Sequence, residues 1–365
     1  MRKRTPDRVF LGIVIFLVIL GLAIFMSASL GLLAQKGIDM GSIALKQLII
    51  GVVGGGFALV LFSNIHYRAL KKYSFYFFLI TFIITLLVFI PSIGIEHGGA
   101  RRWISLGAFS FQPAEFLKLG FVVYFAAVLS STRNRIASIK YGVLPVIVIV
   151  GIIGVVLLAQ PDTGTFLVIL ITAFAMFLAA GGKWKHIALG GVTATVGLGI
   201  LATLRPYIKE RLLTFIDPAR DSLGAGYQIQ QSLIAIGSGE ISGRGLGQSV
   251  QKFNYLPEPI GDSIFAVAAE EFGFIGAAII IAAFLAFAVR GISIAQKAPD
   301  YFSGLLVLGI VILIISQSFI NIASMLGVFP LTGLPLLFIS KGGTALFTAL
   351  ASVGIILNVS KYRRT

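Results

Sequence analysis

Long apolar stretches separated by short polar segments run along almost the whole chain. A helix needs about 20 apolar residues to cross the hydrocarbon core of a membrane, and the chain divides into ten stretches of this kind. They lie near residues 9–33, 45–63, 75–91, 113–131, 141–159, 164–181, 186–204, 263–289, 303–326 and 333–358. The pattern predicts an all-α polytopic membrane protein with ten transmembrane helices, in a single domain over residues 1–365.

The polar segments between these stretches differ in charge. The basic residues of alternate segments, starting at the N-terminus, are Arg2, Lys3, Arg4, Arg8, Arg68, Lys71, Lys72, Arg133, Arg135, Lys140, Lys183, Lys185, Arg290, Lys297, Lys361, Arg363 and Arg364. The short segments on the other side hold only Lys36, Lys46, Arg101 and Arg102. Because cytoplasmic loops are enriched in Lys and Arg, both termini are expected on the cytoplasmic side.

One polar segment is much longer than the others. It covers residues 205–262, between the seventh and eighth predicted helices. The charge pattern places this loop on the extracytoplasmic side. Long loops in compact proteins are commonly functional, so this segment is the first place to look for chemistry.

Composition supports the membrane assignment and narrows the function. The chain is 57% hydrophobic and 12% charged, with a mean hydropathy of +0.99, whereas soluble domains carry about 25% charged residues. The net charge of +15 comes from 29 Lys and Arg in short clusters between apolar runs, which argues against a nucleic-acid partner. The chain has no cysteine, which excludes disulfides and thiol nucleophiles. Its three histidines are far apart and predict no zinc site.

The first candidate site is the end of the long loop, YLPEPIGDSIFAVAAEE at 255–271. Asp262 lies where the chain enters a helix, so it could be an N-cap or a shielded carboxylate with a raised pKa that acts as a general base. Glu270 and Glu271 lie about 12 Å deeper at roughly 1.5 Å per residue. Acidic groups at that depth need partners, and a buried pairing with a basic residue is favoured over a catalytic role.

The second candidate covers 98–118, with Arg101, Arg102, Glu115 and Lys118. Arg suits bidentate contact with phosphate, although either arginine could simply anchor to lipid headgroups. Glu115 and Lys118 share a helix face, where a mutual salt bridge is at least as good an interpretation as ligand contact.

Two weaker candidates lie elsewhere. Asp162 in the sequence QPDTGT first indicates a turn and helix cap. Lys341 precedes Gly342-Gly343 inside the last predicted span. Pairing of Lys341 with Glu270 or Glu271 is favoured over direct substrate contact.

These stretches resemble the SEDS family of FtsW, RodA and their sporulation relative. The matching segments are GGARRWISLGAFSFQPAEFLKL at 98–119, QPDTGT at 160–165, residues 211–276 from RLLTFIDP to EEFGFIG, and NIASMLGVFPLTGLPLLFISKGGTA at 321–345. The likeness extends over the whole chain. The block at 211–276 is the most specific part.

The resemblance implies a bacterial plasma-membrane enzyme that polymerises lipid II, the undecaprenyl-diphosphate-linked disaccharide pentapeptide, with release of undecaprenyl diphosphate. Matching positions make Asp262 the general base, with Arg101, Arg102 and Lys118 on the diphosphate and Trp103, Lys252 and Glu258 as further substrate contacts. Asp162, Glu115, Glu270, Glu271 and Lys341 become supporting residues. A divalent cation, Mg²⁺ or Mn²⁺, is an optional helper.

The resemblance also implies partners, namely a class B penicillin-binding protein that acts as transpeptidase and other divisome or elongasome proteins. The overall character of the motifs is more similar to that of the FtsW division branch than to that of RodA. Two departures stand out. Ile260-Gly261 and Ser263 flank Asp262 where many relatives have His-Thr and Phe, and Lys341 replaces a Tyr, Ser or Ala.

Two other function classes fit the same sequence. Broken helices and buried charges also suit a lipid II flippase or an ion-coupled carrier. A non-catalytic scaffold that recruits division proteins is the third class. The behaviour of an Asp262→Asn variant separates the three.

Overall fold

The computed structural model describes residues 5–34, 40–97, 100–107, 109–218 and 224–363. Helices occupy all ten positions predicted for spans. Seven are long and apolar enough to cross a membrane, namely Arg8–Leu33, Met40–Asn64, Pro113–Ser131, Ile139–Ala159, Ile264–Gln296, Tyr301–Met325 and Gly343–Ser360. Two shorter apolar helices cover Ser74–Phe89 and Thr163–Ala179, and α9 (Trp184–Leu204) covers the seventh predicted position. The prediction of an all-α polytopic membrane protein is confirmed.

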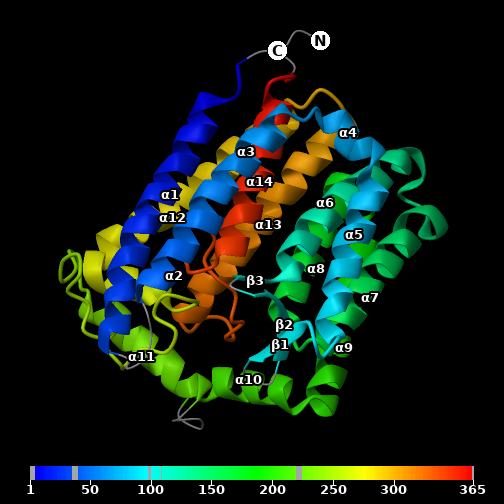
Figure 1. Ribbon diagram of the computed structural model, residues 1–365. Coiled ribbons are helices and arrows are strands. Elements are labelled where there is room, and N and C mark those ends of the chain that lie inside the picture. The colour runs from blue at the N-terminus through cyan, green and yellow to red at the C-terminus, as the bar shows by residue number, and fades with distance from the viewer. Residues whose placement is uncertain (1–4, 35–39, 98–99, 108, 219–223, 364–365) are drawn as a thin grey trace.

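The helices form one elongated bundle (Figure 1). Its elements, in addition to α9, are α1 (Arg8–Ser29), η1 (Leu30–Ala34), α2 (Met40–Lys46), η2 (Gln47–Gly54), α3 (Gly55–Asn64), α4 (Tyr67–Lys72), α5 (Ser74–Leu86), η3 (Leu87–Phe89), α6 (Pro113–Ser131), η4 (Arg133–Arg135), η5 (Ile139–Val143), α7 (Leu144–Ala159), α8 (Thr163–Ala179), α12 (Ile264–Gln296), α13 (Tyr301–Met325) and α14 (Gly343–Ser360). α13 and α14 are the most enclosed and carry much of the core.

The two described chain ends meet at one end of the bundle, as Figure 1 shows. Asp7, the N-cap of α1, accepts hydrogen bonds from Arg290 at 2.8 Å and from Arg363 at 2.7 Å. Burial opposes ionisation of Asp7, but the hydrogen bonds and positive charges of these arginines outweigh it and hold the pKa of the carboxyl below its usual value. The carboxylate therefore ties the start of α1 to α12 and to the C-terminal residues.

The opposite end carries the sheet and the long connection (Figure 1). Strands β1 (Gly94–His97), β2 (Ala100–Leu106) and β3 (Phe109–Phe111) form a small antiparallel sheet that the sequence did not predict. Its register pairs Ile95 with Trp103 and Ile104 with Phe111. The long connection is largely helical, with α10 (Pro206–Ile216) and α11 (Ala225–Ser238) lying across the end of the bundle.

Two long helices depart from the predicted spans. The last span was predicted from residue 333, but α14 begins only at Gly343, and residues 326–342 are non-helical. In α12 the backbone leaves the helical region at Gly273, with φ of 65°. The loop before α12 fills this break, since the amide of Phe274 donates to Glu240 at 2.8 Å and the amide of Arg244 donates to the carbonyl of Glu270 at 3.0 Å. Broken backbone inside a membrane is tolerated only with such partners.

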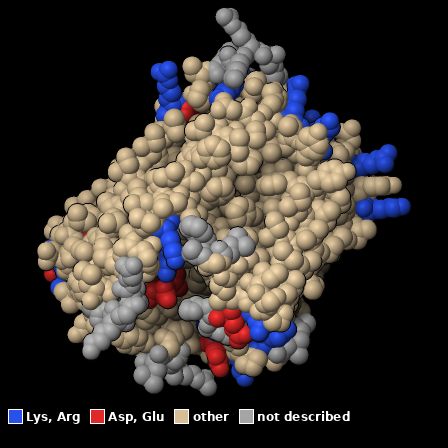
Figure 2. Space-filling model, in the orientation of Figure 1, with Lys and Arg blue, Asp and Glu red and all other residues tan. Residues whose placement is uncertain are grey.

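Figure 2 shows how charge is distributed on one side of the bundle. Most of this side is free of charged groups, as expected of a surface that faces lipid. Acidic and basic side chains lie together around a hollow in its lower half, toward the sheet and α10.

Candidate functional site

Asp262 lies at the end of the long connection, two residues before α12. The N-cap of α12 is Ser263, and its side chain makes no capping bond, so the N-cap interpretation of Asp262 was wrong. The Asp262 side chain is partly exposed. Its Oδ1 accepts a hydrogen bond from Nε2 of Gln228 on α11 at 3.1 Å.

The backbone around Asp262 is held from several directions. Nδ2 of Asn321, on α13, donates to the carbonyl of Asp262 at 2.7 Å. The amide of Lys341 donates to the carbonyl of Ile260 at 2.7 Å, and the amide of Gly261 donates to the backbone carbonyl of Glu258 at 2.9 Å. The carboxylate is therefore presented by a loop whose peptide groups are fixed by distant parts of the chain.

The pKa of Asp262 is raised to about 6. Burial is the main cause, because it disfavours the charged form. The negative charge of Glu258 acts in the same direction, while Gln228 and Arg211 oppose the rise. A carboxyl with this pKa is ionised at neutral pH and remains a better proton acceptor than an ordinary aspartate, in agreement with the raised value that the sequence predicted.

A group of basic residues lies near Asp262. Arg211 on α10 interacts electrostatically with Asp262, with Asp162 and with Arg102. Its pKa is lowered, first by burial and then by the charge of Arg102. Tyr207, one helical turn before Arg211 on α10, has a buried hydroxyl with no hydrogen-bond partner among the described residues. Two arginines and an unpaired phenol beside a carboxylate form a site suited to an anionic ligand.

Arg101 and Arg102 separate in the structure. They are successive residues of β2, so their side chains point to opposite faces of the sheet. Arg102 donates to the carbonyls of Gln160 and Pro161, next to Asp162. Arg101 forms an exposed ion pair with Glu96 at 3.0 Å.

Glu115 and Lys118 form the mutual salt bridge that the sequence left open. The Lys118 ammonium lies 2.8 Å from the Glu115 carboxylate and also donates to Gln317. Both side chains are buried and border a small cavity that Thr348 and Ser352 also line. The geometry does not support direct contact of Lys118 with the diphosphate.

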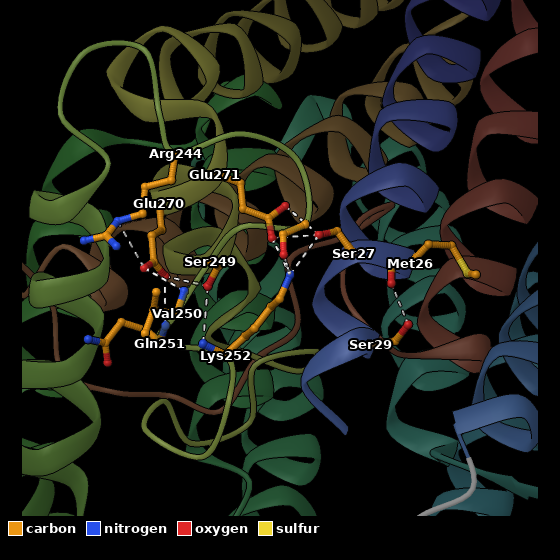
Figure 3. Close-up of polar contacts among 11 residues, drawn as sticks. Met26, Ser27, Ser29, Arg244, Ser249, Val250, Gln251, Lys252, Glu270 and Glu271 are labelled. Atoms are coloured by element: carbon orange, nitrogen blue, oxygen red, sulfur yellow. Dashed lines mark hydrogen bonds and ion pairs between the residues drawn. The ribbon is translucent and has the colours of Figure 1, made fainter. Parts of the chain in front are cut away.

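Glu270 and Glu271 are buried and have partners other than the predicted one (Figure 3). Glu270 accepts from Ser249 at 2.5 Å and from the amide of Val250 at 3.0 Å, with Arg244 at 3.6 Å. Glu271 pairs with Lys252 at 2.7 Å.

Two predictions about lysines in this region were wrong. Lys341 is not the partner of either glutamate, because Lys252 and Arg244 take that place and the Lys341 side chain is exposed. Lys252 is fully enclosed, bonded to Glu271, to Ser27 at 3.2 Å and to the carbonyl of Gly247 at 2.9 Å. It therefore has no surface to offer to a substrate and acts as a structural residue.

The remaining predicted residues lie as follows. Asp162 is the N-cap of α8 and accepts from the amide of Thr165 at 3.1 Å, as the sequence indicated. Trp103 is partly exposed and Glu258 is exposed. Among the described residues, no group of three or more His, Asp or Glu could hold a metal ion. Gly98 and Gly99 of the second motif and Arg220 and Asp221 of the long loop lie outside the described residues.

Sequence reasoning missed three residues that contact or surround Asp262. They are Arg211, Gln228 and Asn321. All three lie inside the segments that carried the family resemblance, and Arg211 follows Tyr207 at the helical spacing of four. The segments pointed to the right regions, but only the fold shows which side chains face Asp262.

Comparisons with known proteins find relatives that match almost the whole length of the chain. Stage V sporulation protein E of Bacillus subtilis (strain 168) is 39% identical over 363 residues, covering 100% of this chain and 99% of that protein. A protein named "Probable peptidoglycan glycosyltransferase FtsW" from Geobacter sp. (strain M18) is 39% identical over 362 residues, covering 98% of this chain and 97% of that protein.

Two solved structures have the same fold. One, described as "Structural coordination of polymerization and crosslinking by a peptidoglycan synthase complex", matches with a TM-score of 0.80 at 27% identity and covers 98% of both chains. The rod shape determining protein RodA of Thermus thermophilus matches with a TM-score of 0.70 at 25% identity, covering 99% of this chain and 98% of that one. The family model described as "Cell cycle protein", for FtsW, RodA and SpoVE, matches residues 7–365. With a matched helix bundle and a family model that spans nearly its whole length, this chain belongs to the FtsW, RodA and SpoVE family.

Proposed function

We propose that this chain is a peptidoglycan glycosyltransferase that polymerises lipid II. Relatives that match nearly its whole length are named probable peptidoglycan glycosyltransferases. The observation that carries the proposal is Asp262, a partly exposed carboxyl with a pKa of about 6 near Arg211, which in turn lies near Arg102. A glycosyl transfer from a diphosphate needs one proton acceptor and cations for the leaving group, and both are present.

The reaction follows from these groups. The 4-hydroxyl of one lipid-linked sugar attacks the anomeric carbon of a second, lipid-linked chain, and the hydroxyl proton passes to Asp262. Gln228 donates to Oδ1, and the lone pairs that this bond leaves free on the carboxylate accept the proton. The new oxygen–carbon bond forms as the bond from the anomeric carbon to the diphosphate oxygen breaks. Undecaprenyl diphosphate leaves with the electron pair, and the anomeric centre inverts.

Arg102 and Arg211 neutralise the departing diphosphate. Negative charge builds up on that group in the transition state, and fixed guanidinium groups stabilise it without reorganisation. The free hydroxyl of Tyr207 is a third donor at this position. Arg101, Trp103 and Glu258 have exposed surface and serve as contacts for the sugars or the peptide.

The site is assigned to the extracytoplasmic side of the bacterial plasma membrane, with both termini in the cytoplasm. The basic segments at the opposite end support this orientation. A class B penicillin-binding protein is the proposed partner, since a structural neighbour is described as a peptidoglycan synthase complex that coordinates polymerization with crosslinking. We place the chain in the FtsW division branch, and other divisome proteins would then contact it.

The test uses the full-length chain, purified with its partner, and lipid II in detergent or vesicles. The parent should produce glycan strands, and Asp262→Asn should lose at least about 100-fold in rate while its melting profile shows a folded protein. Glu210→Gln is the matched control, because Glu210 is an exposed acid on α10.

The alternatives predict other results. A parent that moves lipid II across the bilayer without forming strands would identify a flippase. A parent that forms no strands and moves no lipid, with an Asp262→Asn variant that supports normal cell growth, would identify a scaffold. Either result would overturn the proposal.

A further inference from the structure

Asn321 occupies a buried position on α13, directly behind Asp262. Its side-chain amide Nδ2 donates two hydrogen bonds, to the carbonyl of Asp262 at 2.7 Å and to the carbonyl of Leu334 at 2.8 Å. Asp262 is the last polar residue before the N-cap of α12, and Leu334 lies in the non-helical stretch before α14. One side chain therefore joins three segments that are far apart in sequence.

The orientation of this amide is fixed by its partners. Both partners are carbonyl oxygens, which only accept hydrogen bonds, so the NH₂ group must face them. Oδ1 of Asn321 is buried and has no partner among the described residues. A buried acceptor without a partner is unfavourable and calls for an explanation. We explain the unpaired Oδ1 by the two hydrogen bonds that the NH₂ group of the same amide donates, which require an amide side chain at this position.

A second amide on the same face of α13 supports the same stretch. Gln317 lies one helical turn from Asn321, and its Nε2 donates to the carbonyl of Pro335 at 3.1 Å. Its Oε1 accepts from the Lys118 ammonium, which is held by Glu115 at 2.8 Å. The buried ion pair of α6 thus fixes Gln317, and Gln317 and Asn321 together hold residues 334–335.

The end of this non-helical stretch returns to the Asp262 loop. The amide of Lys341 donates to the carbonyl of Ile260 at 2.7 Å. Gln47 of η2 clamps the same end, accepting from the amide of Gly342 at 3.0 Å and donating to the carbonyl of Ser340 at 3.3 Å. Non-helical backbone in a membrane protein needs such partners, and here the same bonds also set the place of the Asp262 peptide.

We infer that Asn321 is a positioning residue for Asp262. Gln317, held by the Glu115–Lys118 pair, keeps residues 334–335 in place against Asn321, and so keeps Asn321 in place behind Asp262. The inference rests on the proposed role of Asp262 as the base. Asn321 is buried beneath the backbone, so it acts on the reaction only through where it holds the carboxylate. A shift of about 1 Å in a catalytic group can cost roughly 100-fold in rate.

The experiment compares Asn321→Leu with Ser318→Ala in the full-length chain with its partner. Ser318 is also buried on α13, and its hydroxyl donates only to Ile314 of the same helix at 2.8 Å. Turnover is measured with lipid II, and binding is measured separately with fluorescent lipid II. We expect Asn321→Leu to lower kcat by about 10-fold to 100-fold with lipid II affinity within about twofold of the parent, and Ser318→Ala to change neither.

Asn321→Ser serves as a second variant, because serine cannot reach both carbonyls and should give the same separation of kcat from affinity. Gln317→Leu should lower kcat in the same sense, with a smaller effect. Turnover of both Asn321 variants close to the parent's would overturn the inference. Equal losses of affinity and turnover would overturn it too, since they indicate general disruption. An Asp262→Asn variant is run in parallel to separate the two proposals. If Asp262→Asn kept full activity, the proposed role of Asp262 as the general base would fail, whatever the Asn321 variants did.

Discussion

The Lys252 ammonium lies 2.7 Å from the Glu271 carboxylate, and neither side chain has any exposed surface. The pair ties the long connection to α12, and Ser27 of α1 bonds to both members (Figure 3). Removing one partner of a buried pair leaves an uncompensated charge, which costs about 3–5 kcal/mol. We therefore expect Lys252→Met to lower the melting temperature of the detergent-solubilised protein strongly.

The control for this prediction is Arg101→Gln, which breaks the exposed pair with Glu96 and should cost less than about 1 kcal/mol. The double variant Lys252→Met, Glu271→Gln should recover part of the lost stability. A melting temperature for Lys252→Met equal to that of Arg101→Gln would contradict the structural role of the pair.

The rate of polymerisation should depend on pH through Asp262. A base must be ionised to accept a proton, so the rate should fall as the pH drops through about 6, the pKa of Asp262. Burial is the larger cause of that value and Glu258 adds to it. Glu258→Gln should therefore move the acid limb of the rate profile to lower pH. Rates measured from acid to neutral pH, with Glu210→Gln as control, check the direction of this shift.

The same shift predicts that Asp262 reduces the stability of the fold. Its pKa is about 6 in the folded protein against 3.8 for the ordinary carboxyl, so the folded state binds the proton more tightly. The stabilisation from this proton is complete below about pH 4 and is lost as the pH rises through about 6. Above pH 6, Asp262→Asn, which carries no charge, should have a free energy of unfolding about 1–3 kcal/mol greater than the parent's and should therefore melt at a higher temperature. A lower melting point for Asp262→Asn at neutral pH would contradict a carboxylate that is destabilised by desolvation.

Loss of Arg211 should reduce kcat/KM for the substrate, whereas loss of Lys209 on the same helix α10 should not. Arg211→Gln removes a guanidinium near Asp262, whereas Lys209→Gln removes an exposed cation from the same helix. Loss of a charged contact to the diphosphate should lower kcat/KM by about 10-fold to 100-fold. Initial rates over a range of lipid II concentrations test this, and equal effects of the two variants would show that α10 contributes only general positive charge.

The break in α12 should tolerate no side chain. Gly273 has φ of 65°, and a Cβ there would lie 2.3 Å from the amide nitrogen of Gly243. Gly273→Ala should cost at least about 1–3 kcal/mol in strain alone. Gly151→Ala in α7, where a Cβ would meet nothing within 4 Å, should be neutral or stabilising by up to about 1 kcal/mol. Thermal melting of the two variants side by side distinguishes a strained junction from an ordinary helix.

The pattern of apolar residues was enough to predict the helical spans. The length of each apolar stretch and the positions of Lys and Arg reflect the membrane directly. Each span must satisfy its own backbone hydrogen bonds, and charged side chains are costly inside the bilayer. The same local logic predicted the cap at Asp162 and offered the Glu115–Lys118 salt bridge as one of two interpretations, since both depend on residues three apart in one segment. It left Asp262 open between a helix cap and a general base, and the family resemblance favoured the base.

Contacts between residues far apart in the sequence could be learned only from the folded chain. Lys252, and not Lys341, pairs with Glu271. Arg102 bonds to the turn before α8, away from Arg101. Three residues surround Asp262, namely Arg211, Gln228 and Asn321. The break at Gly273 and the small sheet also depend on partners elsewhere in the chain. No periodicity encodes such contacts, because charge pairing and hydrogen bonding across helices depend on how the helices rotate and where the backbone breaks.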